Sequence, residues 1–594
     1  MNPASRIIPR GLIAAALVIV VLAVFGPAAR YGFVGWDDDI LVYNNPHLKP
    51  PRPGNLLRFW RGPHEGLYIP VTYSFWGLLA FSSRGFDPRI FHGANIAIHV
   101  LNVLLLFSIL ERVFRDGTPK PAPSASARGG FRPKRDSGAG AGSETGRILA
   151  ASLGAALYAV HPLQVESVVW VSSLKDLLCG FFSLLALRFY LSYARRSRAG
   201  GRGGMKFAAA ATGAFALALL SKPAAVSLPP IAWLLLHFRP ADPASGRGRD
   251  GRPALFRPPQ SLLLGWILIS VPVVLAAKFA ERDIPLGFVA ALPGRLLIAG
   301  DGLGFYLFKL FVPLNLGIDY GRIPRLVLDD PGSRFFWLIP LLVAALCLLG
   351  RHRRQWLIAL GVFAAGAAPT LGLVPHGFQV FSTVADRFLY LALLGPALAL
   401  GWAAIVRRRS ASIWLGVILV ALLGLGNVRQ RRYWADNLTL FRHALEVNER
   451  SYMAHYNLGL TLDGRGKPAA AVFHYRRALE IKPDYGRAHN NLGAALVRQG
   501  RLAEAIGSFA EAFRLEPGNR GAYFNLYTAH NLRGVELAEA GNPEEAVFHF
   551  SEALRLKPDY DEARRNLSRA RRAGEESGPR PGKESAGGNR DRPE

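Results

Sequence analysis

The sequence is poor in cysteine and in acidic residues. Its 594 residues include only two cysteines, Cys179 and Cys347, and both fall in hydrophobic segments. Two isolated cysteines predict neither a disulfide framework nor a zinc site. The 42 acidic residues are outnumbered by 71 lysines and arginines, and almost none lie inside a hydrophobic segment. Transporters place ionisable groups at mid-membrane depth, so this scarcity counts against a transporter.

Long apolar blocks dominate the first two thirds of the chain. Half of all residues are hydrophobic, and they gather in blocks, whereas soluble proteins alternate polar and apolar segments. We therefore predict a polytopic membrane protein, with an apolar stretch at 293–313 that is re-entrant or interfacial. The eleven expected spans are 11–29, 91–113, 148–161, 174–193, 206–221, 223–238, 261–280, 335–350, 355–372, 386–406 and 411–428.

The net charge of +29 would suit a nucleic-acid-binding protein, but its distribution favours another explanation. Many of the lysines and arginines lie in short loops between apolar blocks, as the positive-inside rule describes. The rule predicts a cytoplasmic N-terminus and a C-terminal region outside, and it favours no nucleic-acid partner. We expect the first span to be an uncleaved anchor that holds the acidic loop at the membrane, with cleavage after Gly26-Pro27-Ala28-Ala29 as the alternative. The basic loops expected in the cytoplasm are 114–147, 194–206, 239–259, 351–354 and 407–409.

Two segments have no apolar periodicity. Residues 114–147 are rich in Gly, Ala, Ser, Pro and Arg, and residues 573–594 are rich in Gly, Pro, Glu and Arg. Neither segment has a face to bury, so we predict that both are disordered spacers.

A repeat of 34 residues begins after about Arg432. Asn457-Leu458-Gly459 recurs as Asn491-Leu492-Gly493, and a further copy follows with seven added residues, or two helical turns. Small residues at a helix crossing and a proline after the second helix are the signature of tetratricopeptide (TPR) repeats. We predict a soluble TPR solenoid over 432–572, in which 434–448 is the second helix of an incomplete first repeat.

TPR solenoids bind proteins or peptides on a concave surface. Asn457, Asn491 and Asn525 share one position by sequence spacing and are candidate ligands for an extended peptide. Alternatively, these asparagines organise the first helix of each repeat, and the short array braces the membrane domain.

Polar residues of several loops meet on the predicted outer face. The first loop, 30–90, carries three successive carboxylates, Asp37, Asp38 and Asp39. Carboxylates beside a membrane are costly and often functional. Further polar residues expected on this face are His92, Asn95, His99, His161, Glu166, Lys175, Lys222, Asp386 and Arg387.

Together these side chains suit glycosyl transfer from a polyprenyl-phosphate sugar. A carboxylate can act as general base toward an acceptor hydroxyl, and cations can hold the phosphate leaving group. Each residue also has a plainer explanation. The carboxylates could mark a solvated loop edge, the His and Asn side chains could bond neighbouring helices, and Lys222 could extend to the membrane surface.

The motifs resemble those of the transmembrane-and-TPR O-mannosyltransferase family and its bacterial relatives, which are C-type (GT-C) glycosyltransferases followed by TPR repeats. The resemblance runs from about Phe33 to Pro558. It rests on Phe33-Val34-Gly35-Trp36-Asp37-Asp38 with Asn45-Pro46, Tyr68-x-Pro70-x-Thr72, His92 with Asn95 and His99, His161-Pro162-x-x-x-Glu166-Ser167, Ser221-Lys222, Phe311-Val312-Pro313-Leu314-Asn315-Leu316-x-Ile318-Asp319-Tyr320 and Asp386-Arg387-Phe388-Leu389-Tyr390-Leu391.

The resemblance implies an acidic first-loop residue as the base or as the group that positions the acceptor. Its adjacent pair falls on Asp37 and Asp38, of which we expect Asp38 to act on the hydroxyl. Arg387, with Lys222 and Lys175, is expected to bind the donor phosphate. Asp37 and Asp38 are also the candidate ligands for a divalent metal, if one binds, and no other cofactor is expected. Asp386 stands where the family often has Glu.

The sequence thus predicts an all-α protein with a GT-C-like membrane domain over 1–428 and a TPR domain over 432–572. We expect an inverting glycosyltransferase in a bacterial inner membrane, with the TPR domain outside the cytoplasm. Its lipid-linked donor would transfer a sugar to a protein or glycan. The alternatives are a non-catalytic TPR scaffold for envelope complexes and a transporter of lipid-linked sugar.

Overall fold

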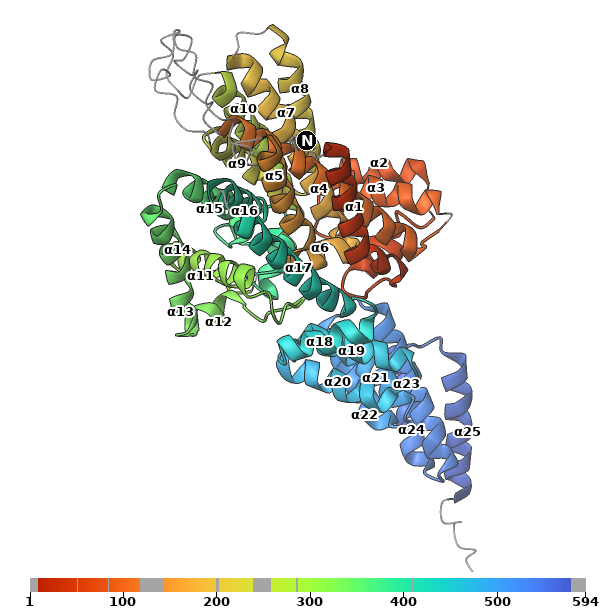
Figure 1. Ribbon diagram of the computed structural model, residues 1–594. Coiled ribbons are helices and arrows are strands. Elements are labelled where there is room, and N and C mark those ends of the chain that lie inside the picture. The colour runs from red at the N-terminus through yellow and green to blue at the C-terminus, as the bar shows by residue number, and fades with distance from the viewer. Residues whose placement is uncertain are drawn as a thin grey trace, which may run out of the picture. The chain divides into compact units, whose positions relative to one another are not determined.

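The computed structural model describes residues 9–50, 52–83, 85–117, 144–198, 202–238, 258–284, 287–407 and 410–577. Across these ranges the chain is helical, with no strand and one isolated bridge between His64 and Leu67. It divides into two units, Met1–Glu449 and Arg450–Glu594. Figure 1 shows their helices in chain order. The all-α prediction is confirmed.

The first unit holds eighteen α-helices within its described residues. They are α1 (Arg10–Phe25), α2 (Pro53–Arg61), α3 (Pro70–Ser82), α4 (Pro88–Gly117), α5 (Glu144–Val160), α6 (Val165–Val169), α7 (Leu174–Arg198), α8 (Met205–Ser221), α9 (Leu228–Leu236), α10 (Pro258–Ala280), α11 (Leu292–Phe311), α12 (Pro324–Asp329), α13 (Ser333–Phe336), α14 (Leu338–Leu349), α15 (Arg353–Ala367), α16 (Leu394–Arg407), α17 (Ser410–Arg432) and α18 (Asn437–Val447).

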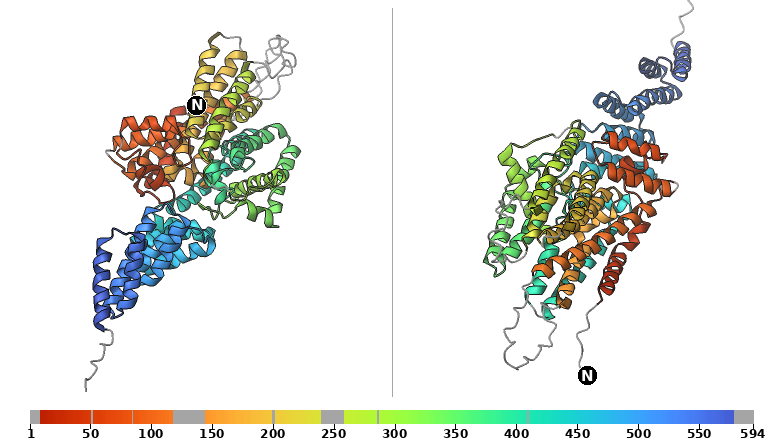
Figure 2. Two further views of the ribbon diagram at one scale, coloured as in Figure 1. Left: turned by 180° about the vertical axis from the view of Figure 1, so that it is seen from behind. Right: turned by 90° about the horizontal axis from the view of Figure 1, so that it is seen from above.

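Every expected span contains a helix, and several helices expose their apolar side chains. Five helical segments are long and apolar enough to cross a membrane, and α5 with α6 forms a sixth segment bent by 55°. Many apolar side chains of α10, α14 and α17 are exposed, as lipid contact requires. Figure 2 shows the helices of this unit from two further directions. The chain is therefore a membrane protein. The count of eleven crossings stays a prediction.

Two boundaries differ from the sequence-based prediction. The expected span at 386–406 begins with a short 3-10 turn, Asp386–Leu389, and its α-helix starts only at Leu394. The loop expected at 114–147 is helical at both ends, because α4 runs to Gly117 and α5 starts at Glu144. The rest of that loop lies outside the described residues.

The stretch at 293–313 forms α11, which is long enough to cross a bilayer. It carries three charged residues, Arg295, Asp301 and Lys309. The Asp301 carboxylate pairs with Arg322 at 2.6 Å, and the Lys309 ammonium donates to the Leu314 carbonyl at 2.6 Å. That charge content keeps α11 out of the set of apolar spans.

The second unit is a stack of helix pairs. It comprises α19 (Tyr452–Gly464), α20 (Pro468–Ile481), α21 (Gly486–Val497), α22 (Leu502–Leu515), α23 (Arg520–Glu539), α24 (Pro543–Leu556) and α25 (Asp561–Ser577). A glycine at each crossing packs against the aromatic ring of the next helix: Gly459 on Tyr475, Gly493 on Phe509 and Gly534 on Phe550. The predicted repeat is confirmed. The tail expected from residue 573 is helical to Ser577, and its remainder lies outside the described residues.

Close helix contact in the first unit depends on glycine. A Cβ added to Gly154 on α5 would lie 2.4 Å from the Ala397 carbonyl oxygen of α16, and one added to Gly401 would lie 2.8 Å from the Ala150 carbonyl oxygen. Small residues at such crossings let two helix backbones meet in a membrane.

We expect Gly154→Val to separate α5 from α16 and to lower the unfolding temperature of the detergent-purified protein markedly. The added side chain overpacks the crossing, which should lower the free energy of unfolding by about 2 kcal/mol or more. Gly213→Val on α8 is the matched control, because no atom lies within 4 Å of its added Cβ. Equal melting of both variants would show that the crossing does not limit stability.

Candidate functional site

The first loop is fixed to the rest of the membrane unit by Asp38. Its Oδ1 accepts hydrogen bonds from the backbone N–H and the hydroxyl of Ser172, at 2.9 and 2.6 Å, and its Oδ2 accepts one from the Val34 N–H at 3.0 Å. The carboxylate is fully buried. Burial raises the pKa of Asp38 to about 7, against the opposing effect of these hydrogen bonds.

Asp37 has the opposite surroundings. It is half-buried, and its carboxylate accepts no hydrogen bond from any described residue. Burial raises its pKa, while the positive charges of Lys175 and Arg387, close enough to act on it, lower the pKa in part. Of the adjacent pair, Asp37 is therefore the carboxylate with unused acceptor capacity. Asp39 begins a short turn, Asp39–Tyr43, and is half-buried.

A buried ion pair joins two of the predicted motifs. The Arg387 guanidinium bonds Glu166 Oε1 through Nη1, and the Arg387 backbone N–H donates to Glu166 Oε2 at 2.8 Å. The guanidinium also lies 4.2 Å from the ring centre of Phe378 and 5.2 Å from that of Trp170. Glu166 uses one of the five guanidinium N–H groups in this bond, so donors remain for another anion.

The two predicted lysines differ in their partners. The Lys222 ammonium pairs with Asp176 Oδ1. Lys175 is buried and stands 5.0 Å from the Trp170 ring centre, and within the described ranges its ammonium has no hydrogen bond or ion pair. Within the described residues, neither Lys175 nor Asp37 thus has a hydrogen bond or ion pair from its side chain. A cavity of about 30 Å³ beside it is lined by Asp176, Lys222 and Arg387 among others.

The supporting residues are engaged in buried contacts between helices. The His99 imidazole donates to the Ala159 carbonyl at 3.0 Å and accepts from the Tyr390 hydroxyl at 2.9 Å. Asn95 donates to the Trp170 carbonyl at 2.9 Å. The others make similar contacts: His92 with the Gly32 carbonyl at 3.2 Å, His161 with the Leu310 carbonyl at 3.1 Å, and Asp386 with the Tyr320 hydroxyl at 2.7 Å. These contacts position the loops.

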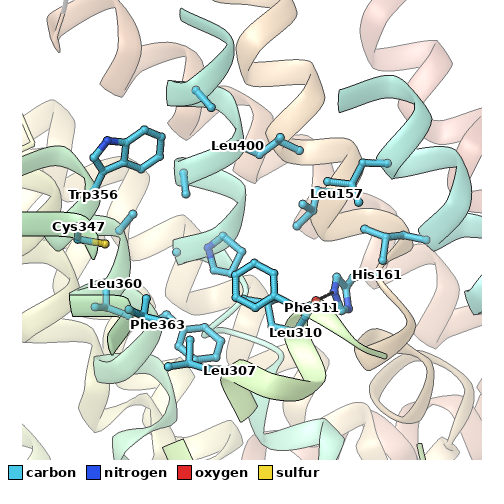
Figure 3. Close-up of a pocket in the computed structure, with 18 residues that line it drawn as sticks. Leu157, His161, Leu307, Leu310, Phe311, Cys347, Trp356, Leu360, Phe363 and Leu400 are labelled. Atoms are coloured by element: carbon cyan, nitrogen blue, oxygen red, sulfur yellow. Dashed lines mark hydrogen bonds between the residues drawn. The ribbon is translucent and has the colours of Figure 1, made fainter. Parts of the chain in front are cut away.

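Next to this network lies an apolar pocket of about 410 Å³ (Figure 3). His161 forms its polar edge, and Trp356, Phe311, Phe363 and Leu400 are among its walls. His161 precedes Glu166 by five residues, so this wall leads into the segment that holds the buried ion pair.

The helix α18 contacts the first loop. The Gly35 N–H donates to Asn437 Oδ1 at 2.8 Å, and the Trp36 ring lies 6.4 Å from that of Phe441. On its other side the His443 imidazole donates to the Leu316 carbonyl at 2.8 Å. The helix expected to open the TPR array therefore packs within the membrane unit.

The asparagines proposed for peptide binding do not share one environment. Asn457 is buried, whereas Asn491 donates to the Tyr456 hydroxyl at 3.0 Å. Both precede the crossing glycine of their helix by two residues, but Asn525 precedes Gly534 by nine and donates to Asn490 at 2.9 Å. Seven extra residues in α23 move Asn525 two turns from the crossing.

Sequence reasoning missed Ser172, Trp170 and Asn437. Ser172 and Trp170 lie between the His161–Ser167 motif and Lys175, and neither their residue type nor their spacing indicates a functional role. Asn437 is the first residue of α18, where an asparagine is ordinarily expected to cap the helix. As for a metal, no three His, Cys, Asp or Glu side chains come together within the described part of the chain.

Comparison with known proteins supports the predicted resemblance. The chain is 26% identical to human protein O-mannosyl-transferase TMTC4 over 519 residues, covering 78% of this chain and 65% of that protein. The mouse TMTC4 protein is also 26% identical, covering 74% of this chain and 62% of itself. The chain thus spans somewhat less than two thirds of the length of these relatives. It is similar to transmembrane-and-TPR O-mannosyltransferases, as its motifs predicted.

Tetratricopeptide repeat family models match residues 423–486, 456–520 and 527–560. The first match includes α18. Among solved structures, YrrB, described as a TPR protein with an unusual peptide-binding site, is 24% identical and covers 29% of this chain and 82% of itself. Its TM-score is 0.18, too low to support an argument.

The raised pKa of Asp38 predicts a pH-dependent stability. The folded state holds its proton up to about pH 7, whereas the unfolded chain releases it near the ordinary value of 3.8. The stabilisation that protonation provides is therefore complete below pH 3.8 and is lost as the pH rises toward 7. We expect the melting temperature of the purified protein to fall between pH 5 and pH 8, and less so in Asp38→Asn. The same slope in both proteins would assign it to another group.

Proposed function

We propose that this chain is a membrane glycosyltransferase that moves a sugar from a polyprenyl-phosphate donor to a hydroxyl of a protein or glycan acceptor. The observation that carries the proposal is an unbonded carboxylate, Asp37, close to an unbonded ammonium, Lys175, and to the Arg387 guanidinium. This arrangement offers a base for the acceptor and cations for the donor phosphate. The named activity of the relatives is consistent with it.

The proposed reaction is a single displacement with inversion. Asp37 takes the proton of the acceptor hydroxyl, and the hydroxyl oxygen forms a bond to the anomeric carbon. The bond from that carbon to the phosphate oxygen breaks, and polyprenyl phosphate leaves with one more negative charge. Lys175 and the free N–H groups of Arg387 stabilise that charge.

In this proposal Asp38 and Glu166 act as positioning residues. Asp38 bonds Ser172 and so fixes the loop that carries Asp37, and Glu166 orients Arg387. This assigns the base to Asp37, in place of the Asp38 role expected from the sequence, because the Asp38 oxygens are already engaged. No metal is required for any step.

The apolar pocket beside His161 suits the lipid part of the donor. A polyprenyl chain is pure hydrocarbon, and the described wall of this pocket is made almost wholly of apolar side chains. Lipid binding there would place the attached phosphate toward the His161–Glu166 segment. The positive-inside pattern supports a site on the side of the membrane away from the cytoplasm, and the proposed membrane is a bacterial inner membrane.

We expect Asp37→Asn to lower sugar transfer by about 100-fold or more, the usual contribution of a general base. The measurement is transfer of radiolabelled mannose from polyprenyl-phosphate mannose to envelope proteins, in membranes of cells that lack the gene and carry each variant. Asp39→Asn is the matched control, since it removes a neighbouring carboxylate that bonds neither substrate in this scheme. Its activity should stay within about threefold of wild type.

The same strains separate the enzyme from the scaffold alternative. The scaffold explanation predicts that Asp37→Asn restores every envelope phenotype, whereas deletion of residues 450–594 restores none. If mass spectrometry of envelope glycoconjugates shows no difference between wild type and Asp37→Asn, the catalytic proposal is wrong.

We also propose that α18 positions the catalytic loop. Asn437→Leu removes the acceptor for the Gly35 N–H and should lower kcat about tenfold, the effect of one lost buried hydrogen bond. Because Asp also offers an acceptor oxygen at that place, Asn437→Asp should recover most of the rate. A rise in KM without a change in kcat, in steady-state transfer assays, would contradict this role.

A further inference from the structure

A basic pocket lies far along the membrane unit from the proposed catalytic site. Its volume is about 480 Å³, and its described lining consists of Arg112 from α4, Arg188, Ser192, Arg195 and Arg196 from α7, and Phe207 from α8. Four of these six residues are arginines, and none is acidic.

Helical spacing explains why the arginines converge. Arg188, Ser192, Arg195 and Arg196 stand at positions i, i+4, i+7 and i+8 of α7, which lie on one face of a helix. Arg112 reaches the same place from α4, which packs along α7. The positive-inside rule explains why arginines are frequent near this membrane surface. It does not explain why four of them line one pocket.

The guanidinium groups are held by hydroxyls. Arg112 and Arg188 both donate through Nη1 to Ser192 Oγ, the second at 3.1 Å, and Arg188 Nε donates to Ser108 Oγ at 2.9 Å. The Arg196 guanidinium lies 4.3 Å from the Phe207 ring centre. A neutral hydroxyl or ring orients a guanidinium but leaves its charge in place.

Arg112 and Arg188 share one acceptor, the Ser192 hydroxyl. Two guanidinium groups sharing one hydroxyl repel each other, and a partly buried site screens that repulsion poorly. An anion with several oxygens would relieve it, and planar guanidinium groups match phosphate oxygens in pairs.

The position excludes the donor phosphate of the catalytic site. Lys175 and Arg195 are twenty residues apart on α7, and His92 and Arg112 are twenty apart on α4. At 1.5 Å per residue each separation is roughly 30 Å, the thickness of a bilayer core. The pocket therefore belongs to the opposite membrane surface.

We propose that this arginine pocket binds a phosphate group at the membrane surface opposite the catalytic loop. The phosphate could come from the headgroup of an anionic phospholipid or from a soluble phosphate. Both sources present the same oxygens to the guanidinium groups, and an experiment can distinguish them.

The test uses the full chain purified in neutral detergent. Its melting temperature and its native mass spectrum are recorded with phosphatidylglycerol, with phosphatidylcholine and with inorganic phosphate. We use Arg195→Gln and Arg196→Gln singly, because both side chains are exposed and their loss should leave folding intact. Arg354→Gln removes the same charge from an exposed arginine at the start of α15 and is the matched control.

A phospholipid source predicts retention of phosphatidylglycerol over phosphatidylcholine, with about tenfold weaker binding in each pocket variant and none of this loss in Arg354→Gln. A soluble source predicts stabilisation by inorganic phosphate with the same dependence on the pocket arginines. The proposal is overturned if neither ligand binds, or if Arg354→Gln weakens binding as much as the pocket variants do.

Discussion

The ion pair between Glu166 and Arg387 organises the candidate site of the membrane unit. A buried carboxylate that lacks partners is costly, and here one Glu166 oxygen bonds the guanidinium while the other bonds the Arg387 backbone N–H. The two residues are 221 positions apart, so this contact joins distant parts of the membrane unit at the candidate site. It holds the guanidinium in place, and the charge of that group acts on both Asp37 and Lys175.

The proposed roles of the two adjacent carboxylates differ because their environments differ. Asp38 has given its oxygens to Ser172 and Val34, which makes it an anchor for the first loop. Asp37, the residue directly before it, accepts no hydrogen bond from a described residue. A base needs a lone pair that is free to face its substrate, whereas Asp38 already accepts three hydrogen bonds. Exchange of these tasks would require the loop to detach from Ser172.

The sequence was sufficient for properties that local periodicity encodes. Apolar blocks predicted the helices of the membrane unit, and the 34-residue spacing predicted the repeats. It was insufficient wherever pairing across the chain decides the outcome. Nothing in the type of Ser172 shows that it holds Asp38, 134 residues away. Equal spacing likewise placed Asn525 with Asn457, but the longer α23 moves it two turns from the crossing glycine.

The helix α18 belongs to the repeats by sequence and to the membrane unit by packing. The tetratricopeptide match that begins at residue 423 includes it, yet Asn437 and Phe441 contact Gly35 and Trp36. Gly35 and Trp36 directly precede Asp37, so a shift of α18 would move the backbone that carries the proposed base. Only four residues separate α18 from α19, the first helix of the second unit. The chain therefore connects the repeats, by only these four residues, to the helix that contacts the residues before the proposed base.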